Sequence, residues 1–77
     1  MPTILLQNGF RFFFYANEHL PIHIHVSKGD AIAKIELDPE IDIIYNRSFK
    51  PREIKQIVDI IVENYEYLIE QWHETFN

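Results

Sequence analysis

The sequence NEHLPIHIHV, at residues 17–26, is the stretch that most directly indicates the fold. In its second half His23 and His25 alternate with single aliphatic residues, which predicts a strand over residues 22–27. Successive side chains of a β-strand point to opposite faces, so both histidines should share one face and the aliphatic residues the other. A half-buried strand packs its apolar face on the core. We therefore expect the histidine face to be open to water or to a ligand.

A β-hairpin is predicted ahead of this strand. Residues 3–6 and 10–15 are rich in strand-forming side chains and flank an Asn-Gly pair at 8–9, which suits a type I′ turn. This turn places Leu5 opposite Phe12. The second run is apolar on both faces, so we expect a central strand that is covered on both sides, with a subunit contact as the alternative.

A second hairpin is predicted to follow, because residues 31–37 alternate again after a short turn that contains glycine. Two registers are open. In one, His25 lies opposite Lys34 and His23 lies opposite Glu36, whereas in the other His23 lies opposite Lys34. Both registers place these four side chains on one face, as a polar and titratable patch.

The last third of the chain predicts one long helix. A short fifth strand at 41–45 and a linker at 46–50 precede residues 51–76, where proline stands first and apolar residues recur three and four apart. The expected fold is a single α+β domain over residues 1–77: a four- to five-stranded, mostly antiparallel sheet in residues 1–45, with one long C-terminal helix packed on one face. Apolar residues outside the main helix stripe leave a homodimer open.

The amino-acid composition and the net charge exclude or disfavour several kinds of protein. The 77 residues include no cysteine, which excludes disulfides and cysteine-bound zinc. The formal net charge of −5 argues against sequence-independent nucleic-acid binding, because neutralising phosphates requires excess Lys and Arg. Four of the seven Lys and Arg residues cluster between positions 47 and 55. No stretch resembles a signal peptide or a membrane helix, so we expect a cytoplasmic protein with no membrane partner.

Metal binding is one chemistry that the histidines suggest. Neutral imidazole is the most common metal ligand among side chains, and two histidines on one strand face supply two ligands. His19, or Glu18 in its place, would complete a set with His23 and His25. The predicted cofactor is a divalent cation such as Zn²⁺.

A small hydrolytic, nuclease-like site is a second possibility. The catalytic candidates are then His23 and His25, either of which can act as a general base near pH 7. Lys50 and Arg52 would hold a phosphate at the N-terminus of the helix. A third possibility is purely structural, with histidine hydrogen bonds that fix the loop and the strand edge. Whether the protein is an enzyme stays open at this point.

Several segments together resemble the bacterial domain-of-unknown-function family 4160. The similarity is carried by residues 1–4, 9–15, 18–26 and 49–53, with Trp72 and Phe76. Its most specific part is the pattern Glu-His-x-Pro-x-His-x-His-Val at 18–26. The resemblance implies a small α+β protein of prokaryotic or phage type, encoded beside another small protein in a toxin–antitoxin arrangement. It implies no catalytic residues.

We therefore expect a component of a toxin–antitoxin-like or regulatory module that acts through a small partner protein encoded nearby, or through RNA. The alternative is a metal-binding or small hydrolytic protein that uses the same histidines. The residues predicted to form the binding surface are His19, His23, His25, Lys34, Glu36, Lys50 and Arg52.

Overall fold

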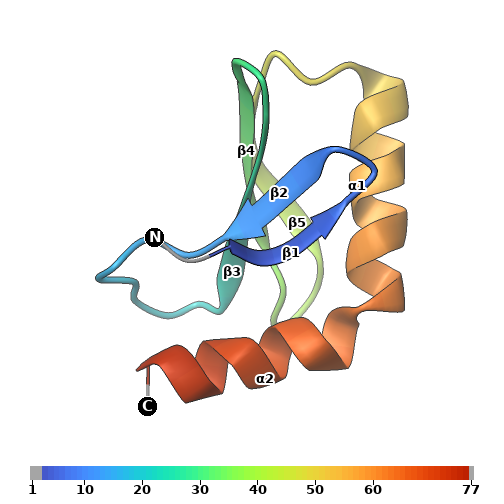
Figure 1. The fold of residues 1–77 in the computed structure, drawn as a ribbon. Coiled ribbons are helices and arrows are strands. Elements are labelled where there is room, and N and C mark those ends of the chain that lie inside the picture. Colours follow the sequence, from blue (N-terminus) through green and yellow to red (C-terminus); the bar gives the residue numbers. More distant parts are fainter. Residues whose placement is uncertain (1–2, 77) are drawn as a thin grey trace.

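The computed structural model describes residues 3–76 as an open antiparallel sheet with two helices (Figure 1). The elements are β1 (Thr3–Gln7), β2 (Phe10–Phe13), β3 (His23–Lys28), β4 (Ala31–Glu36), β5 (Asp42–Arg47), α1 (Pro51–Glu63) and α2 (Tyr65–Phe76). The five strands lie side by side in sequence order, and each neighbouring pair is antiparallel. The predicted α+β class and sheet are confirmed. Residues 1, 2 and 77 of the expected domain, which include the start of the 1–4 motif, lie outside the described part.

The first hairpin has the predicted turn and register. Asn8 and Gly9 have φ angles of 54° and 81°, as a type I′ turn requires. Leu5 pairs with Phe12, as expected. A non-glycine residue at positive φ is strained unless it is Asn or Asp, so this dipeptide sets the reversal locally.

The second hairpin adopts the first of the two open registers. His25 pairs with Lys34, and His23 pairs with Glu36. On its other side, His25 pairs with Phe13 of β2. Because directly paired residues share a face, these five side chains leave the sheet on the same side.

The opposite face of the sheet carries the core. Val26 pairs with Phe12 and Ala33, Ile24 pairs with Ile35, and all five side chains are fully buried. Helix α1 lies along this face (Figure 1). Its buried residues are Ile57, Ile60 and Ile61. Burying one such side chain stabilises the fold by about 1.5–3 kcal/mol, so this contact is a main source of stability.

The prediction of a single long helix is wrong, because the helical region divides at Asn64 into α1 and α2. Asn64 has φ −115° and ψ 19°, and its side-chain Nδ2 donates to the Ile60 carbonyl at 2.8 Å. Its backbone N–H donates to the carbonyls of Ile60 and Ile61. Asparagine side chains compete for backbone groups in this way, and here the competition ends the helix. Figure 1 shows α2 turned across one end of the sheet.

Two tyrosine hydroxyls fix α2 to that end of the sheet. Tyr65 donates to the carbonyl of Leu37, and Tyr67 donates to the carbonyl of Ile4 at 2.9 Å. The apolar spacing continues through the helix break and no Pro or Gly marks it, so the periodicity alone does not reveal the turn. Neither helix in residues 3–76 is long and apolar enough to cross a membrane.

Candidate functional site

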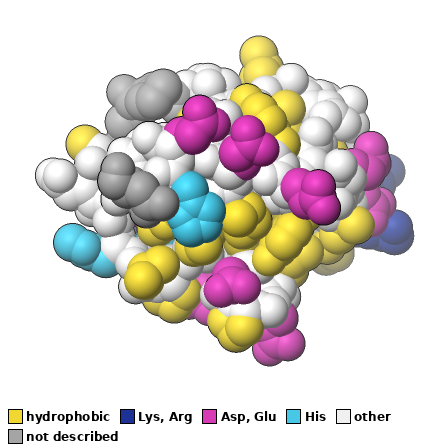
Figure 2. All heavy atoms as spheres, turned by 90° about the horizontal axis from the view of Figure 1, so that it is seen from below, with side chains coloured by type: hydrophobic (Ala, Val, Ile, Leu, Met, Phe, Trp, Pro, Cys, Tyr) yellow, Lys and Arg dark blue, Asp and Glu magenta, His cyan; other side chains and the backbone are white. Residues whose placement is uncertain are grey.

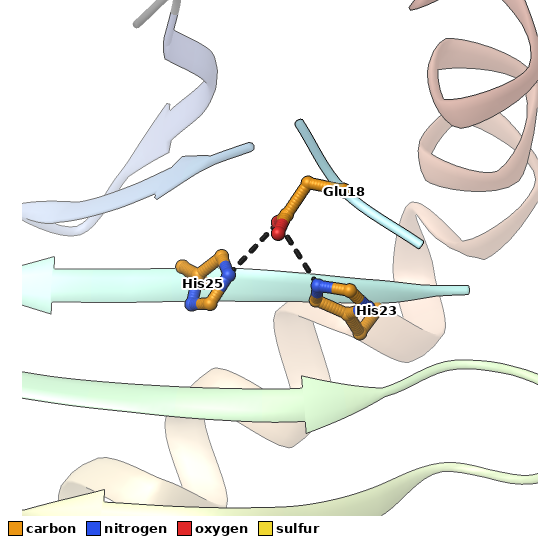
Figure 3. Close-up of side chains that lie close together, drawn as sticks. All are labelled: Glu18, His23 and His25. Atoms are coloured by element: carbon orange, nitrogen blue, oxygen red, sulfur yellow. Dashed lines mark hydrogen bonds and ion pairs between the residues drawn. The ribbon is translucent and has the colours of Figure 1, made fainter. Parts of the chain in front are cut away.

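The site consists of one carboxylate and two imidazoles. Strand β3 presents His23 and His25 on the same face, and the loop between β2 and β3 brings Glu18 over them (Figure 3). Glu18 Oε2 lies 2.9 Å from Nε2 of His23 and 2.9 Å from Nε2 of His25. The alternation in the sequence therefore predicted the shared face correctly, and Glu18 rather than His19 is the third member.

The expectation that this face is open to water is wrong around the histidines. The exposed fractions of His23 and His25 are 3% and 4%. The ring of Trp72 in α2 lies 5.1 Å from the ring of His23, while Phe13 and Tyr15 lie 5.7 Å and 4.4 Å from the ring of His25. The physical reason is the helix break, which places α2 against this end, together with the loop that folds back over β3.

The hydrogen bonding of His23 leaves a lone pair directed at Glu18. Nδ1 of His23 lies 2.7 Å from the Pro21 carbonyl oxygen, and since a carbonyl only accepts, Nδ1 is the donor. On a neutral ring, Nε2 is then an acceptor that faces a carboxylate oxygen 2.9 Å away. Two acceptors this close need either a shared proton or a metal ion between them.

Burial favours the neutral form of His25. Its Nε2 lies within hydrogen-bond distance of Glu18 Oε2, at 2.9 Å, and among residues 3–76 its buried Nδ1 has no partner. Burial lowers the pKa of His25 below the ordinary 6.5, and His23 and Lys34 lower it further, while Glu18 opposes the shift. A lowered pKa favours neutral imidazole, which is the form that binds metals.

A hollow borders this cluster at Glu18. It has a volume of about 580 Å³ and is lined by Glu18, His19, Leu20, Trp72, His73 and Phe76. Glu18 therefore belongs both to the buried cluster and to the wall of the hollow. Figure 2 views the molecule from the α2 side, where histidine and hydrophobic side chains lie together and acidic side chains surround them.

The remaining predicted site residues lie outside the cluster. Lys34 and Glu36 are partly exposed on β4, opposite the two histidines. His19 is exposed at the hollow. Lys50 and Arg52 are exposed where α1 begins, near the β3–β4 turn and at the other end of the sheet from α2 (Figure 1). The structure thus does not bring the basic pair to the histidines.

Two aromatic members of the site have no local signal in the sequence. The sequence predicts a strand over residues 10–15, but β2 ends at Phe13, and Tyr15 turns its ring to His25. Trp72 falls within the predicted helix 51–76, whose apolar spacing does not mark it as a site residue. Its contact with His23 depends on the direction of α2, which the periodicity does not specify.

The donor set has the composition and spacing of a metal site. One ligand atom from each of Glu18, His23 and His25 lies within 4.8 Å of the other two. Carboxylate oxygen and imidazole nitrogen bind Zn²⁺ at about 2.0–2.2 Å, which separates neighbouring ligands of a tetrahedral ion by about 3.4 Å. The two distances from Glu18 Oε2 to the histidine nitrogens, 2.9 Å each, are about half an ångström shorter than this spacing.

The fold and the site together define a small α+β protein with a partly buried carboxylate and two buried histidines. The family model for the domain of unknown function DUF4160 matches residues 9–73, and the chain belongs to this family. The matched span includes Glu18, His23 and His25. No curated protein and no solved structure matches the chain.

Proposed function

We propose that this protein binds a divalent metal ion, such as Zn²⁺, through Glu18, His23 and His25. The observation that carries the proposal is the contact between Nε2 of His23 and the Glu18 carboxylate, because Nδ1 already donates to Pro21. Metal-bound histidines usually donate their other ring N–H to a carbonyl or carboxylate in the same way. His25 would bind through Nε2 with its ring proton on Nδ1.

Three protein ligands support a catalytic rather than a purely structural centre. Structural zinc sites usually have four protein ligands, whereas catalytic sites have three and leave a position for water or substrate. Glu18 borders the hollow, so the fourth position would be reached from solvent through it. A bound divalent ion would lower the pKa of a coordinated water and supply a nucleophile for hydrolysis. The chain itself supplies the orientation of the ligands and a site from which most water is excluded.

The experiment is isothermal titration of tag-free, metal-depleted protein with Zn²⁺ and Mn²⁺, supported by thermal unfolding. At a metal concentration 100 times Kd, binding should stabilise the protein by about 2.7 kcal/mol. For a domain of this size, the melting temperature should then rise by roughly 10–20 °C. Glu18→Gln and His25→Gln should lose most of the heat signal and most of the shift.

His19→Ala is the matched control, since it removes an exposed histidine next to Glu18. It should bind metal as the parent does. A parent protein that shows neither heat nor a thermal shift would contradict the proposal. Equal loss in His19→Ala and Glu18→Gln would show that the ligand set is wrong.

The resemblance also supports a second role, in a toxin–antitoxin-like or regulatory module with a partner protein or RNA. Lys50 and Arg52 are exposed at the beginning of α1, where they are accessible to phosphates or acidic side chains. Co-expression with the neighbouring gene product should yield a complex that the double variant Lys50→Glu/Arg52→Glu weakens. The absence of both a complex and a growth effect would argue against this role.

A further inference from the structure

Strand β5 has one side without a neighbouring strand. It pairs only with β4 in the sheet of residues 3–76 and forms one edge of it (Figure 1). All six of its residues are exposed, and the exposed fractions of Ile43, Ile44 and Tyr45 are 38%, 43% and 39%. An apolar edge strand is a template for another strand, because its outward backbone N–H and C=O groups lack strand partners.

The other edge of the sheet, β1, is better protected. Ile4 and Leu5 are partly buried and pack against the core. The Ile4 carbonyl also accepts a hydrogen bond from the Tyr67 hydroxyl of α2. Helix α2 thus fixes β1, while β5 has no comparable cover among the described residues.

We propose that β5 pairs with β5 of a second copy of this chain, antiparallel, about a twofold axis between Ile44 and Tyr45. In this register Asp42 lies opposite the partner's Arg47, and Ile44 lies opposite the partner's Tyr45. The two five-stranded sheets then become one continuous sheet. The same surface patch is used by both copies, as a twofold dimer requires.

The proposed register requires Asp42 and Arg47 to lie on the same face of β5, and the irregular pairing of β4 with β5 allows this. Asp42 pairs with Glu36 and Arg47 pairs with Ile32, and these two β4 residues are four apart, so Asp42 and Arg47 share a face. In a regular strand two residues five positions apart would point to opposite faces. The register shift between Lys34 and Ile35 removes that mismatch.

The charges at the two ends of β5 are complementary between copies. Asp42 has the carboxylate of Glu36 as its cross-strand neighbour, which is a repulsive pair. Within residues 3–76, neither Asp42 nor Arg47 forms an ion pair. Dimerisation would place the partner's Arg47 beside Asp42, and by symmetry this pair occurs twice. The apolar contact between Ile44 and the partner's Tyr45 lies between the two pairs.

Sedimentation velocity and light scattering of the full chain, from low micromolar to several hundred micromolar, test the proposal. The parent should approach twice the monomer mass. Asp42→Arg creates two Arg–Arg pairs and Arg47→Asp creates two Asp–Asp pairs, so each variant alone should dimerise roughly tenfold more weakly or worse. An equimolar mixture of the two variants should dimerise like the parent, because every pair across that interface is again opposite in charge.

Glu66→Arg and Arg52→Asp are matched controls, since they make the same charge changes at exposed positions on the helices. Both should dimerise as the parent does, and circular dichroism at a concentration where every protein is monomeric should show the same thermal transition in all variants. A parent that stays monomeric at several hundred micromolar overturns the proposal and leaves this edge for a strand of a different protein. Charge variants that dimerise normally, or a mixture that fails to recover, also overturn it.

Discussion

Strands β3 and β5 have the same length but opposite environments. In β3, whose sequence is HIHVSK, the first four residues are buried. In β5, whose sequence is DIIYNR, every residue is exposed. β5 has the larger apolar side chains, so hydrophobicity alone would predict the reverse. β3 lies between β2 and β4, while β5 has a neighbour on one side only. Position in the sheet therefore determines burial here more than composition does.

This difference in burial also separates the histidines chemically. His25 is surrounded by Glu18, Phe13 and Tyr15, and its pKa is lowered by burial. His19 is exposed only six residues away. The same side chain is therefore a candidate ligand in one place and an ordinary surface residue in the other.

The largest effect should come from truncating matched isoleucines in the two strands. Ile24→Ala removes a fully buried side chain from β3 and should lower the free energy of unfolding by about 2–5 kcal/mol. Ile44→Ala in β5 should change it by less than about 1 kcal/mol, because that side chain is already largely hydrated. Urea denaturation at low protein concentration measures both. Equal losses would show that β5 is covered in solution.

A smaller effect is expected from removing the carboxylate above β3. In metal-free protein, Glu18→Ala leaves Nε2–H of the buried His25 without its acceptor, which should cost about 1–3 kcal/mol of unfolding free energy. Glu40→Ala removes an exposed carboxylate and should change the value by at most about 0.5 kcal/mol. If the two variants are equally stable by urea denaturation, Glu18 does not stabilise the buried histidine.

The smallest effect is the pH dependence that His25 contributes. Because its folded-state pKa lies below 6.5, the unfolded chain binds a proton first as the pH falls. The free energy of unfolding should therefore decrease below about pH 6.5, by at most about 1.4 kcal/mol per pH unit, until the folded-state pKa is reached.

Glutamine does not titrate, so the His25→Gln variant should lack the decrease in unfolding free energy that His25 contributes below about pH 6.5. The His19→Gln variant should keep it. Unfolding measured in metal-free buffers between pH 5 and pH 8 provides the comparison. If the stability difference between the parent and His25→Gln instead increases as the pH falls through this range, the sign of the shift is wrong.

Local features of the sequence predict much of the sheet. The Asn8–Gly9 turn requires positive φ angles that few other dipeptides tolerate, so it defines the first hairpin and its register. The alternation around His23 and His25 predicts their shared face. In the second hairpin the sequence left two registers open, because both preserve the faces, and only the pairing of His25 with Lys34 decides between them.

The candidate site was only partly predictable, because alternation specifies the faces of a strand but not the path of a loop. Two of its three members, His23 and His25, come from one strand and follow from period-two alternation. The third, Glu18, comes from a loop, whose path depends on what it packs against, and it was named only as an alternative to His19. The predicted grouping of Lys50 and Arg52 with the histidines rested on phosphate binding at a helix N-terminus, yet a helix length separates the beginning of α1 from α2 (Figure 1).

The sequence by itself determined the strand faces, the turns and the apolar stripe that packs α1 on the sheet, because these depend on φ preferences and on periodicity between near neighbours. The tertiary structure alone decided that α2 lies across one end of the sheet, that Trp72 closes over His23, and that β5 remains at an edge. Each of these depends on contacts between residues far apart in the chain. Such contacts determine which polar side chains lose water, and so which histidines can hold a metal.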